Sequence, residues 1–233
     1  MSVQSYPRAK DVPPSEQAAC VEIAQAYSDQ DPRCLARLAE LFIEAHHAAP
    51  GGVSIEFGTR KGGSAVLFLQ LLLRLYPELQ PMLFTVDPYG LKSYDGGDCV
   101  VANGLYGDDE YLAAKAVLRG YPNHAHFLME SSLFLTRMWG LRFYRDGRLH
   151  LLKDASFIFH DADHSWRAII EDVDAVGFGA SWIDPRGLVV VDNVHADPKT
   201  AALLQRQYPG VKLEKQYAVL RGNVVRLDGA PRR

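Results

Sequence analysis

Residues 156–166 place an apolar strand directly before a cluster of titratable side chains. Residues 157–159 lack the polar alternation of a half-exposed strand, which is typical of a parallel strand covered on both faces. The residues that follow include Asp161, Asp163 and His164. In open α/β sheets, ligands bind outside the carboxyl ends of the strands. The stretch therefore predicts a parallel sheet with a ligand site at this strand end, while a helix cap at Asp163 or Ser165 stays open as the alternative.

The size of the chain favours one domain. Its 233 residues, 48% of them hydrophobic, are enough for one well-buried core and few for two. We expect a single domain over 1–233, with a helical preface over 1–50 and a core over 53–228. The net charge is −3 and no long run of one sign occurs, so we expect a small-molecule partner and no nucleic acid.

The cysteines and the N-terminus bear on the compartment. Cys20, Cys34 and Cys99 are widely spaced and odd in number, which favours reduced thiols in a cytoplasm. Residues 1–14 lack the apolar stretch of a signal peptide, and no later window is apolar enough to cross a membrane. The sequence therefore predicts a soluble, cytoplasmic protein without a membrane partner. A homodimer stays open.

The preface precedes every predicted strand. Apolar residues at helical spacing predict helices over 15–30 and 32–48, the second with Asp31-Pro32 as its start signal. His46 and His47 end that helix, where a positive charge suits the helix dipole, and we expect both at the surface.

A glycine-rich turn follows the first predicted strand. The strand over 53–57 leads into residues 58–64, which contain three glycines, and a leucine-rich helix over 65–76 comes next. Such a turn lets the backbone approach a ligand closely and directs the helix N-terminus at it. The glycine spacing is not that of the dinucleotide-binding motif.

The second predicted strand ends in a carboxylate. Residues 82–86 are mostly apolar, and Asp87 follows them directly. One carboxylate at this position can accept hydrogen bonds from both hydroxyls of a nucleoside ribose. A plain turn at Asp87-Pro88 is the alternative, and the preceding glycine turn favours the ligand interpretation.

The rest of the chain alternates between strands and helices. Long loops in compact domains are often functional, so the Gly- and Tyr-rich stretch over 89–109 is expected to cover the site. The further predicted elements are a helix to Gly120, a strand over 126–129, a helix over 133–139, a hairpin insertion over 141–152, a helix over 168–176, a strand over 187–191, a helix over 198–208 and a terminal antiparallel pair formed by 213–220 and 224–227. The fold class is therefore α/β: a Rossmann-like, mostly parallel sheet of seven strands with an antiparallel terminal hairpin, flanked by helices.

Two strand ends supply oxygen ligands for a metal. Asp161 follows one apolar strand, and Asp192-Asn193 follow another. Oxygen donors suit a hard cation such as Mg²⁺, with Mn²⁺ or Ca²⁺ as alternatives. Zinc is disfavoured because no Cys/His set has the required spacing.

These motifs resemble a known family. The turn Glu56-x-Gly58-x-x-x-Gly62-x-Ser64 is similar to the first motif of class I S-adenosylmethionine (SAM) methyltransferases. Asp161 and the later Asp192-Asn193 pair resemble the metal ligands of metal-dependent O-methyltransferases of the catechol and caffeoyl-CoA type. The resemblance covers about residues 53 to 193 and leaves out the preface and the 141–152 hairpin.

The resemblance implies roles for particular residues. It implies SAM binding by Glu56, Gly58, Thr59, Gly62, Ser64, Asp87, Ser131, Ser132 and Asp161, and metal binding by Asp161, Asp192 and Asn193. The family's general base is usually a lysine three residues after the first aspartate, and this chain has His164 there. Bacterial O-methyltransferases that act on sugars and other natural products use a histidine in that role, so His164 is the implied catalytic base.

The implied function is divalent-metal-dependent transfer of a methyl group from SAM to a hydroxyl of a small molecule. The expected acceptors are natural products, sugars and catechol-like metabolites. Three alternatives stay open: a metal-independent SAM methyltransferase, an enzyme of the same fold with different chemistry such as hydroxylation, and a SAM-binding module without turnover.

Overall fold

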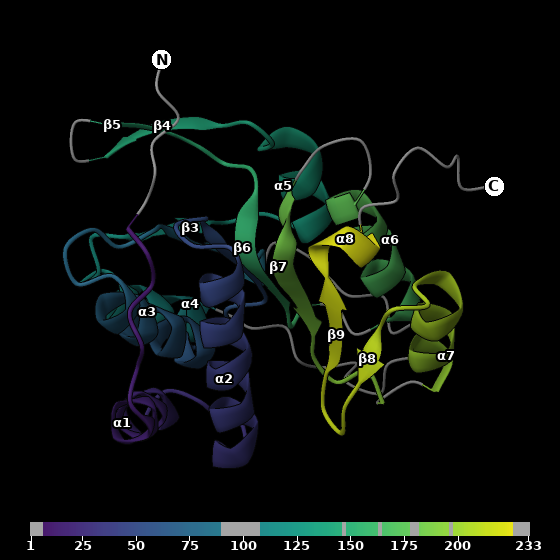
Figure 1. The fold of residues 1–233 in the computed structure, drawn as a ribbon, viewed down its shortest axis with the longest axis horizontal. Coiled ribbons are helices and arrows are strands. Elements are labelled where there is room, and N and C mark those ends of the chain that lie inside the picture. The colour runs from purple at the N-terminus through teal and green to yellow at the C-terminus, as the bar shows by residue number, and fades with distance from the viewer. Residues whose placement is uncertain are drawn as a thin grey trace.

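The computed structural model describes residues 7–89, 108–145, 148–162, 165–177, 182–195 and 198–225. Seven strands form one sheet in the order β3-β2-β1-β6-β7-β9-β8 (Figure 1). Their bounds are β1 Ser54–Phe57, β2 Leu83–Val86, β3 His124–Phe127, β6 Ala155–His160, β7 Ile183–Val191, β8 Lys212–Leu213 and β9 Ala218–Arg221. The first five are parallel, while β9 pairs antiparallel with β7 and with β8. The predicted sheet, with its antiparallel end, is confirmed.

Helices cover both faces of the sheet (Figure 1). One face is covered by α1 Pro14–Gln25, α2 Pro32–Ala48, α3 Gly63–Leu75 and α4 Asp108–Leu118. The other is covered by α5 Ser131–Arg137, α6 Trp166–Gly177, α7 Pro198–Gln207 and α8 Gly222–Val225. None of the helices in the described ranges is both long enough and apolar enough to cross a membrane.

Strand β6 explains why the sheet needs both layers. Phe157 and Phe159 pack into the core beneath α2 and α3, while Ile158 packs into the core beneath α6. All six residues of the strand are buried. Its continuous apolar run therefore reflects two buried faces, as the sequence predicts.

The order of the strands fixes where a ligand can bind. From β1 the chain proceeds outward through β2 to β3, and it then returns to place β6 on the other side of β1. The helices that follow β1 and β6 consequently lie on opposite faces. A crevice opens at such a switch point, outside the carboxyl ends of the two strands.

The helical preface is stabilised by a capping residue at the start of α2 and by packing against the core. Asp31 caps α2 by accepting a hydrogen bond from the Arg33 N–H, as its Asp-Pro start predicts. The expectation that His46 lies at the surface is wrong. Its ring is fully buried, with Nδ1 3.2 Å from the Tyr76 hydroxyl and Nε2 2.9 Å from the Ser54 hydroxyl. Burial lowers the pKa of His46 to about 3, so the ring is neutral.

The predicted terminal pair is misplaced. Its strands are β8 and β9, with the turn between them, and the segment from Gly222 forms the short helix α8 rather than a hairpin turn and strand. A Cβ at Gly222 would lie 1.9 Å from the Asp184 carbonyl oxygen, so this close backbone contact requires glycine. The hairpin predicted over 141–152 is confirmed by β4 Arg142–Arg145 and β5 Arg148–Leu151.

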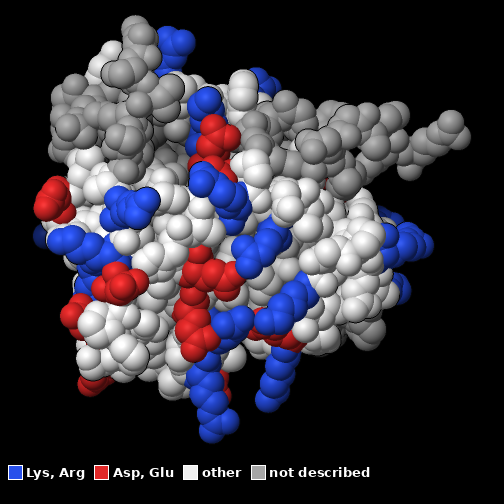
Figure 2. Space-filling model, viewed as in Figure 1, with Lys and Arg blue, Asp and Glu red and all other residues white. Residues whose placement is uncertain are grey.

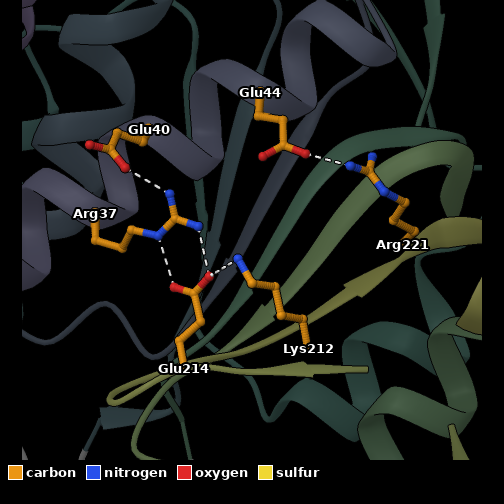
Figure 3. A network of polar contacts seen from close by, with 6 residues as sticks. All are labelled: Arg37, Glu40, Glu44, Lys212, Glu214 and Arg221. Atoms are coloured by element: carbon orange, nitrogen blue, oxygen red, sulfur yellow. Dashed lines mark hydrogen bonds and ion pairs between the residues drawn. The ribbon is translucent and has the colours of Figure 1, made fainter. Parts of the chain in front are cut away.

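Ion pairs tie the preface to the terminal hairpin (Figure 3). The Arg37 guanidinium donates two hydrogen bonds to the Glu214 carboxylate, at 2.8 and 2.7 Å, and Lys212 lies 2.8 Å from the same carboxylate. Arg221 pairs with Glu44 at 2.6 Å. Acidic and basic side chains are interspersed over this face of the molecule (Figure 2).

Candidate functional site

A cavity of about 300 Å³ lies at the switch point. Its walls come from the turn after β1, the ends of β6 and β7, the α1–α2 connector and the terminal hairpin. The lining residues are Tyr27, Ser28, Asp29, Gln30, Gly58, Thr59, Arg60, Lys61, Gly63, Ser64, Asp161, Asp192, Asn193 and Gln216. The lining is mainly polar, which suits a charged or hydroxyl-bearing ligand.

The glycine turn forms one wall because larger residues would not fit. Gly58 has a φ of +88°, and a Cβ there would lie 2.0 Å from the Asp161 carbonyl oxygen. Gly62 is left-handed, with a φ of +91°, and is the N-cap of α3. These two glycines let the chain leave β1 and start α3 beside the end of β6.

Asp87 holds the turn from beneath. Its Oδ2 accepts hydrogen bonds from the Thr59 and Arg60 N–H groups at 2.8 and 3.0 Å, and its Oδ1 accepts from the Tyr89 N–H at 2.8 Å. The side chain is buried and does not line the cavity. Asp87 therefore has a structural task in addition to the ribose contact expected from sequence.

Glu56 lies below the cavity, in the middle of β1. Its carboxyl accepts a hydrogen bond from the Ser64 hydroxyl at 2.5 Å. Burial raises the pKa of Glu56 to about 8, and the Asp87 carboxylate adds to the rise. The group is thus protonated at neutral pH in the folded protein and ionised in the unfolded chain.

This difference predicts a pH dependence of stability. Because the folded pKa lies above the unfolded value, the free energy of unfolding should fall as pH rises from about 5 to about 8. Glu56→Gln should flatten that slope, since the amide keeps a neutral partner for Ser64. Urea unfolding at several pH values in this range measures the slope, with Glu40→Gln at an exposed glutamate as control. Equal slopes in the parent and Glu56→Gln would contradict the buried neutral carboxyl.

Asp161 and Asp192 bring two carboxyl groups together. They follow the neighbouring strands β6 and β7, whose pairing places the Asp192 N–H 2.9 Å from the His160 carbonyl oxygen. Burial first, and then the Asp192 carboxylate, raise the pKa of Asp161 well above its usual value. A hydrogen bond joins the two groups, so protonated Asp161 can donate to Asp192. Two carboxyls held this closely favour either a shared proton or a cation.

Amide side chains surround the carboxyl pair. Gln216 Nε2 donates to Asp192 Oδ1 at 2.8 Å and to Asn193 Oδ1 at 2.6 Å. Asn193, with a φ of +53°, donates through Nδ2 to Asp192 Oδ2 at 2.9 Å. Gln30 Nε2 donates to Asp161 Oδ2 at 3.3 Å. Within the described ranges, no three His, Cys, Asp or Glu side chains form a metal cluster. The oxygen donors at this spot are two carboxylates and amides.

The α1–α2 connector closes the cavity from the preface side. Asp29 pairs with Arg60 at 2.9 Å and with Lys61 at 3.6 Å, both from the glycine turn. A Cβ at Gly63 would lie 2.5 Å from the Ser28 Cβ, so the connector contacts the start of α3 directly.

A second groove lies beyond Asp87. Ser132, at the start of α5, lines it with Pro88, residues 128–130, Leu133 and Thr136. Ser131 donates instead to Asp172 on α6, at 2.5 Å. That Asp172 carboxylate also lies 2.9 Å from His160 Nε2, in a buried contact behind the site.

The predicted site residues divide into three groups. The cavity is lined by Gly58, Thr59, Ser64, Asp161, Asp192 and Asn193. Glu56, Gly62, Asp87, Ser131 and Ser132 lie around it without lining it. His164 and most of the cover predicted over 89–109 fall outside the described residues. Sequence reasoning missed the residues 27–30 and Gln216, which carry no motif and reach the site only through long-range packing.

No protein-family model and no curated protein matches the sequence. Solved structures do match by fold. CalS11, a calicheamicin methyltransferase, has 13% identity over 95% of this chain and 98% of its own, with a TM-score of 0.60. The O-methyltransferase NovP has 11% identity over 84% and 81%, with a TM-score of 0.56. A putative caffeoyl-CoA O-methyltransferase from Staphylococcus aureus has 14% identity over 87% and 90%, with a TM-score of 0.53.

These TM-scores and coverages show that the structures share the overall fold of this chain. The similarity covers the preface as well as the core, because the alignment with CalS11 extends over almost the whole of both chains. The chain therefore has the Rossmann-like fold of class I SAM-dependent methyltransferases.

Proposed function

We propose that the protein transfers a methyl group from SAM to a hydroxyl of a small molecule, with the help of a divalent cation. The observation that carries the proposal is the meeting of the glycine turn with Asp161, Asp192 and Asn193 around one cavity at the switch point. The turn supplies a cofactor wall, and the carboxyl pair supplies oxygen donors, at the place where the two reactants would have to meet.

The cofactor is assigned to the glycine turn and the strand ends next to it. Thr59 and Ser64 line the cavity from the turn, and the N-terminus of α3 begins there. Three of the four lone pairs of the Asp87 carboxylate accept from backbone N–H groups, so Asp87 is proposed to accept a hydrogen bond from the ribose with the lone pair left on Oδ1. The groove lined by Pro88 and Ser132 would take the adenine.

The residues at the carboxyl pair fit a hard cation. Asp161, Asp192 and Asn193 can all offer oxygen donors. Burial is the main cause of the raised pKa of Asp161, and the Asp192 carboxylate adds to it through a repulsion that a divalent cation would relieve. Gln216 and Gln30 now donate amide hydrogens to these same oxygens. When bound, Mg²⁺ or a similar ion would lower the pKa of a substrate hydroxyl and fix its direction.

The chain's own task is to place the reactants and to move a proton. The substrate oxygen forms a bond to the methyl carbon as the carbon–sulfur bond breaks, and S-adenosylhomocysteine leaves. The hydroxyl proton passes to the base, which we assign to His164 from its sequence position. The α1–α2 connector, held by Asp29 to the glycine turn, would exclude water from the reacting atoms.

The acceptor class follows from the polar lining. Hydroxyl-rich or ionic acceptors suit a wall made of carboxylates, amides and the cations Arg60 and Lys61. CalS11 is described as a TDP-rhamnose 3′-O-methyltransferase in calicheamicin biosynthesis. We therefore place sugars of natural products before catechols as acceptors, and a cation-independent methyltransferase as the second candidate.

Formation of S-adenosylhomocysteine and a methylated product from a panel of sugar nucleotides, glycosides and catechols tests the function. Asp87→Ala should bind S-adenosylhomocysteine at least about tenfold more weakly, because a buried carboxylate that accepts several hydrogen bonds is lost. Isothermal calorimetry measures the affinity, and turnover at limiting SAM should fall with it.

A ligand pair separates the ribose role of Asp87 from its support of the turn. The parent should prefer adenosine to 2′,3′-dideoxyadenosine, and Asp87→Ala should lose that preference. If the variant binds both nucleosides more weakly by the same factor, Asp87 acts only through Thr59 and Arg60. Unchanged cofactor affinity would remove both roles.

A further inference from the structure

Another cavity, of about 340 Å³ and distinct from the groove at Ser132, lies between α4 and the edge strand β3. Among the described residues, it shares none with the cavity at the switch point, and it shares Leu128 with the groove lined by Pro88 and Ser132. Its lining residues are Tyr111, Ala114, Lys115, Leu118, Arg119, His124, His126, Phe127 and Leu128. The volume is within the range of small-molecule sites.

Lys115 and Arg119 make the mouth of this cavity positive. Lys115 lies in the last turn of α4, and Arg119 directly follows the helix, with its N–H bonded to the Lys115 carbonyl oxygen at 3.2 Å. Both side chains are exposed. Among the described residues, no Asp or Glu lines the cavity. Neither cation has a carboxylate partner among the described residues, although Lys115 lies 5.6 Å from the centre of the Tyr111 ring. A ligand with one anionic group suits this rim.

The floor and the inner wall are apolar and aromatic. Ala114 and Leu118 are 2% exposed and form the α4 side. The ring of His126 lies against Tyr111 and Tyr89, with ring centres 6.1 and 5.6 Å apart. A flat ring between these side chains would bury apolar surface and contact aromatic faces.

One polar group in the wall has no partner. His126 Nε2 is buried and makes no hydrogen bond within the described part of the chain. The other ring nitrogen, Nδ1, lies 2.7 Å from the Thr85 hydroxyl, which also lies 2.8 Å from His124 Nε2. A buried polar atom without a partner is costly, so a ligand that satisfied Nε2 would gain affinity.

Thr85 links the tautomers of the two histidines. Burial lowers the pKa of His126, and it lowers that of His124 to about 4, so both rings are neutral at pH 7. The single hydroxyl proton of Thr85 can be donated to one ring only, and the other ring must donate to the oxygen. His126 Nε2 is therefore an N–H in one arrangement and a lone pair in the other. A ligand hydroxyl, which both donates and accepts, satisfies either one.

We propose that this cavity binds a small aromatic carboxylate that carries a ring hydroxyl, that is, a hydroxybenzoate-like acid. The carboxylate pairs with Lys115 and Arg119, the ring lies between α4 and β3, and the hydroxyl bonds His126 Nε2. The site borders the groove assigned to the adenine at Leu128, but it lies outside the cavity at the switch point and does not depend on methyl transfer.

Calorimetry with benzoate, 3-hydroxybenzoate and 4-hydroxybenzoate tests the site. At least one hydroxybenzoate should bind saturably, and about two- to tenfold more tightly than benzoate, as one hydrogen bond provides. Lys115→Ala/Arg119→Ala should lose at least about tenfold in affinity for all three acids. Arg137→Ala/Arg206→Ala removes the same charge from the last turns of α5 and α7 and should leave binding unchanged.

A second variant tests the hydroxyl contact alone. His126→Phe keeps a ring against Tyr89 and Tyr111 but lacks the nitrogen, so benzoate affinity should persist while the preference for the hydroxyl disappears. The absence of saturable binding would overturn the proposal, as would equal affinity in Lys115→Ala/Arg119→Ala. Displacement of the acid by S-adenosylhomocysteine would place it in the cofactor site and also overturn the proposal.

Discussion

Asp192→Ala should lose turnover on the order of a thousandfold, which is the rate equivalent of the several kcal/mol that a metal ion supplies to such a reaction. The residue shares a hydrogen bond with Asp161 and accepts another from Gln216, so its loss removes one of two carboxylates from the proposed cation site. Chelator should likewise abolish turnover in the parent, and added Mg²⁺ or Mn²⁺ should restore it. The variant should not be rescued by added metal.

Two controls make this result specific. Asp11→Ala removes an exposed carboxylate from the segment that contacts the far end of α3, and it should keep full activity. Calorimetry with Mn²⁺ should show binding to the parent and to Asp11→Ala but not to Asp192→Ala. Full activity of the parent in excess chelator would favour the cation-independent methyltransferase instead, with Asp161 and Asp192 acting only on the local structure.

His164→Ala should lower turnover by about a hundred- to ten-thousandfold, the usual effect of losing a general base. This prediction rests on the position of His164 three residues after Asp161 and on the resemblance that this spacing carries. An imidazole is neutral near physiological pH and can take the proton of the acceptor hydroxyl. The loss should be smaller for acceptors whose hydroxyl is already acidic, because they need less help from a base.

Controls must distinguish the loss of a general base from a loss of the folded structure. His164→Ala should keep its affinity for S-adenosylhomocysteine and for Mn²⁺, and His47→Ala, at an exposed histidine on α2, should behave as the parent. Turnover of the best acceptor within a few-fold of the parent across the pH range would show that His164 is not the base.

The sheet could be predicted because its signals are local. The apolar run of β6 indicates a strand that is buried on both faces. The glycines after β1 indicate a turn in which a larger residue would not fit. Parallel strands bring their carboxyl ends to one edge, so the strand-end residues Asp161 and Asp192 could be expected to meet without any knowledge of the loops.

What the sequence missed depends on partners far along the chain. His46 ends a helix in a position that suits an exposed cation, yet Ser54 and Tyr76 satisfy both of its ring nitrogens inside the core. Gln216 reaches Asp192 only because the terminal hairpin turns at residues 214–217 rather than at Gly222. Neither pairing leaves a periodicity or a motif that could be recognised beforehand.

The bond between Arg37 and Glu214 joins residues 177 positions apart, and it has a consequence for biosynthesis. The ribosome would release α2 long before the β8–β9 hairpin that packs against it. The side of the cavity that includes Gln216 can therefore form only late in translation. Contacts of such long sequence separation slow folding, because the chain entropy is lost before the contact forms. A nascent chain halted before Glu214 should therefore hold most of its helices while the pocket edge beside Gln216 is still missing. Pulse proteolysis of stalled chains of increasing length would reveal that step.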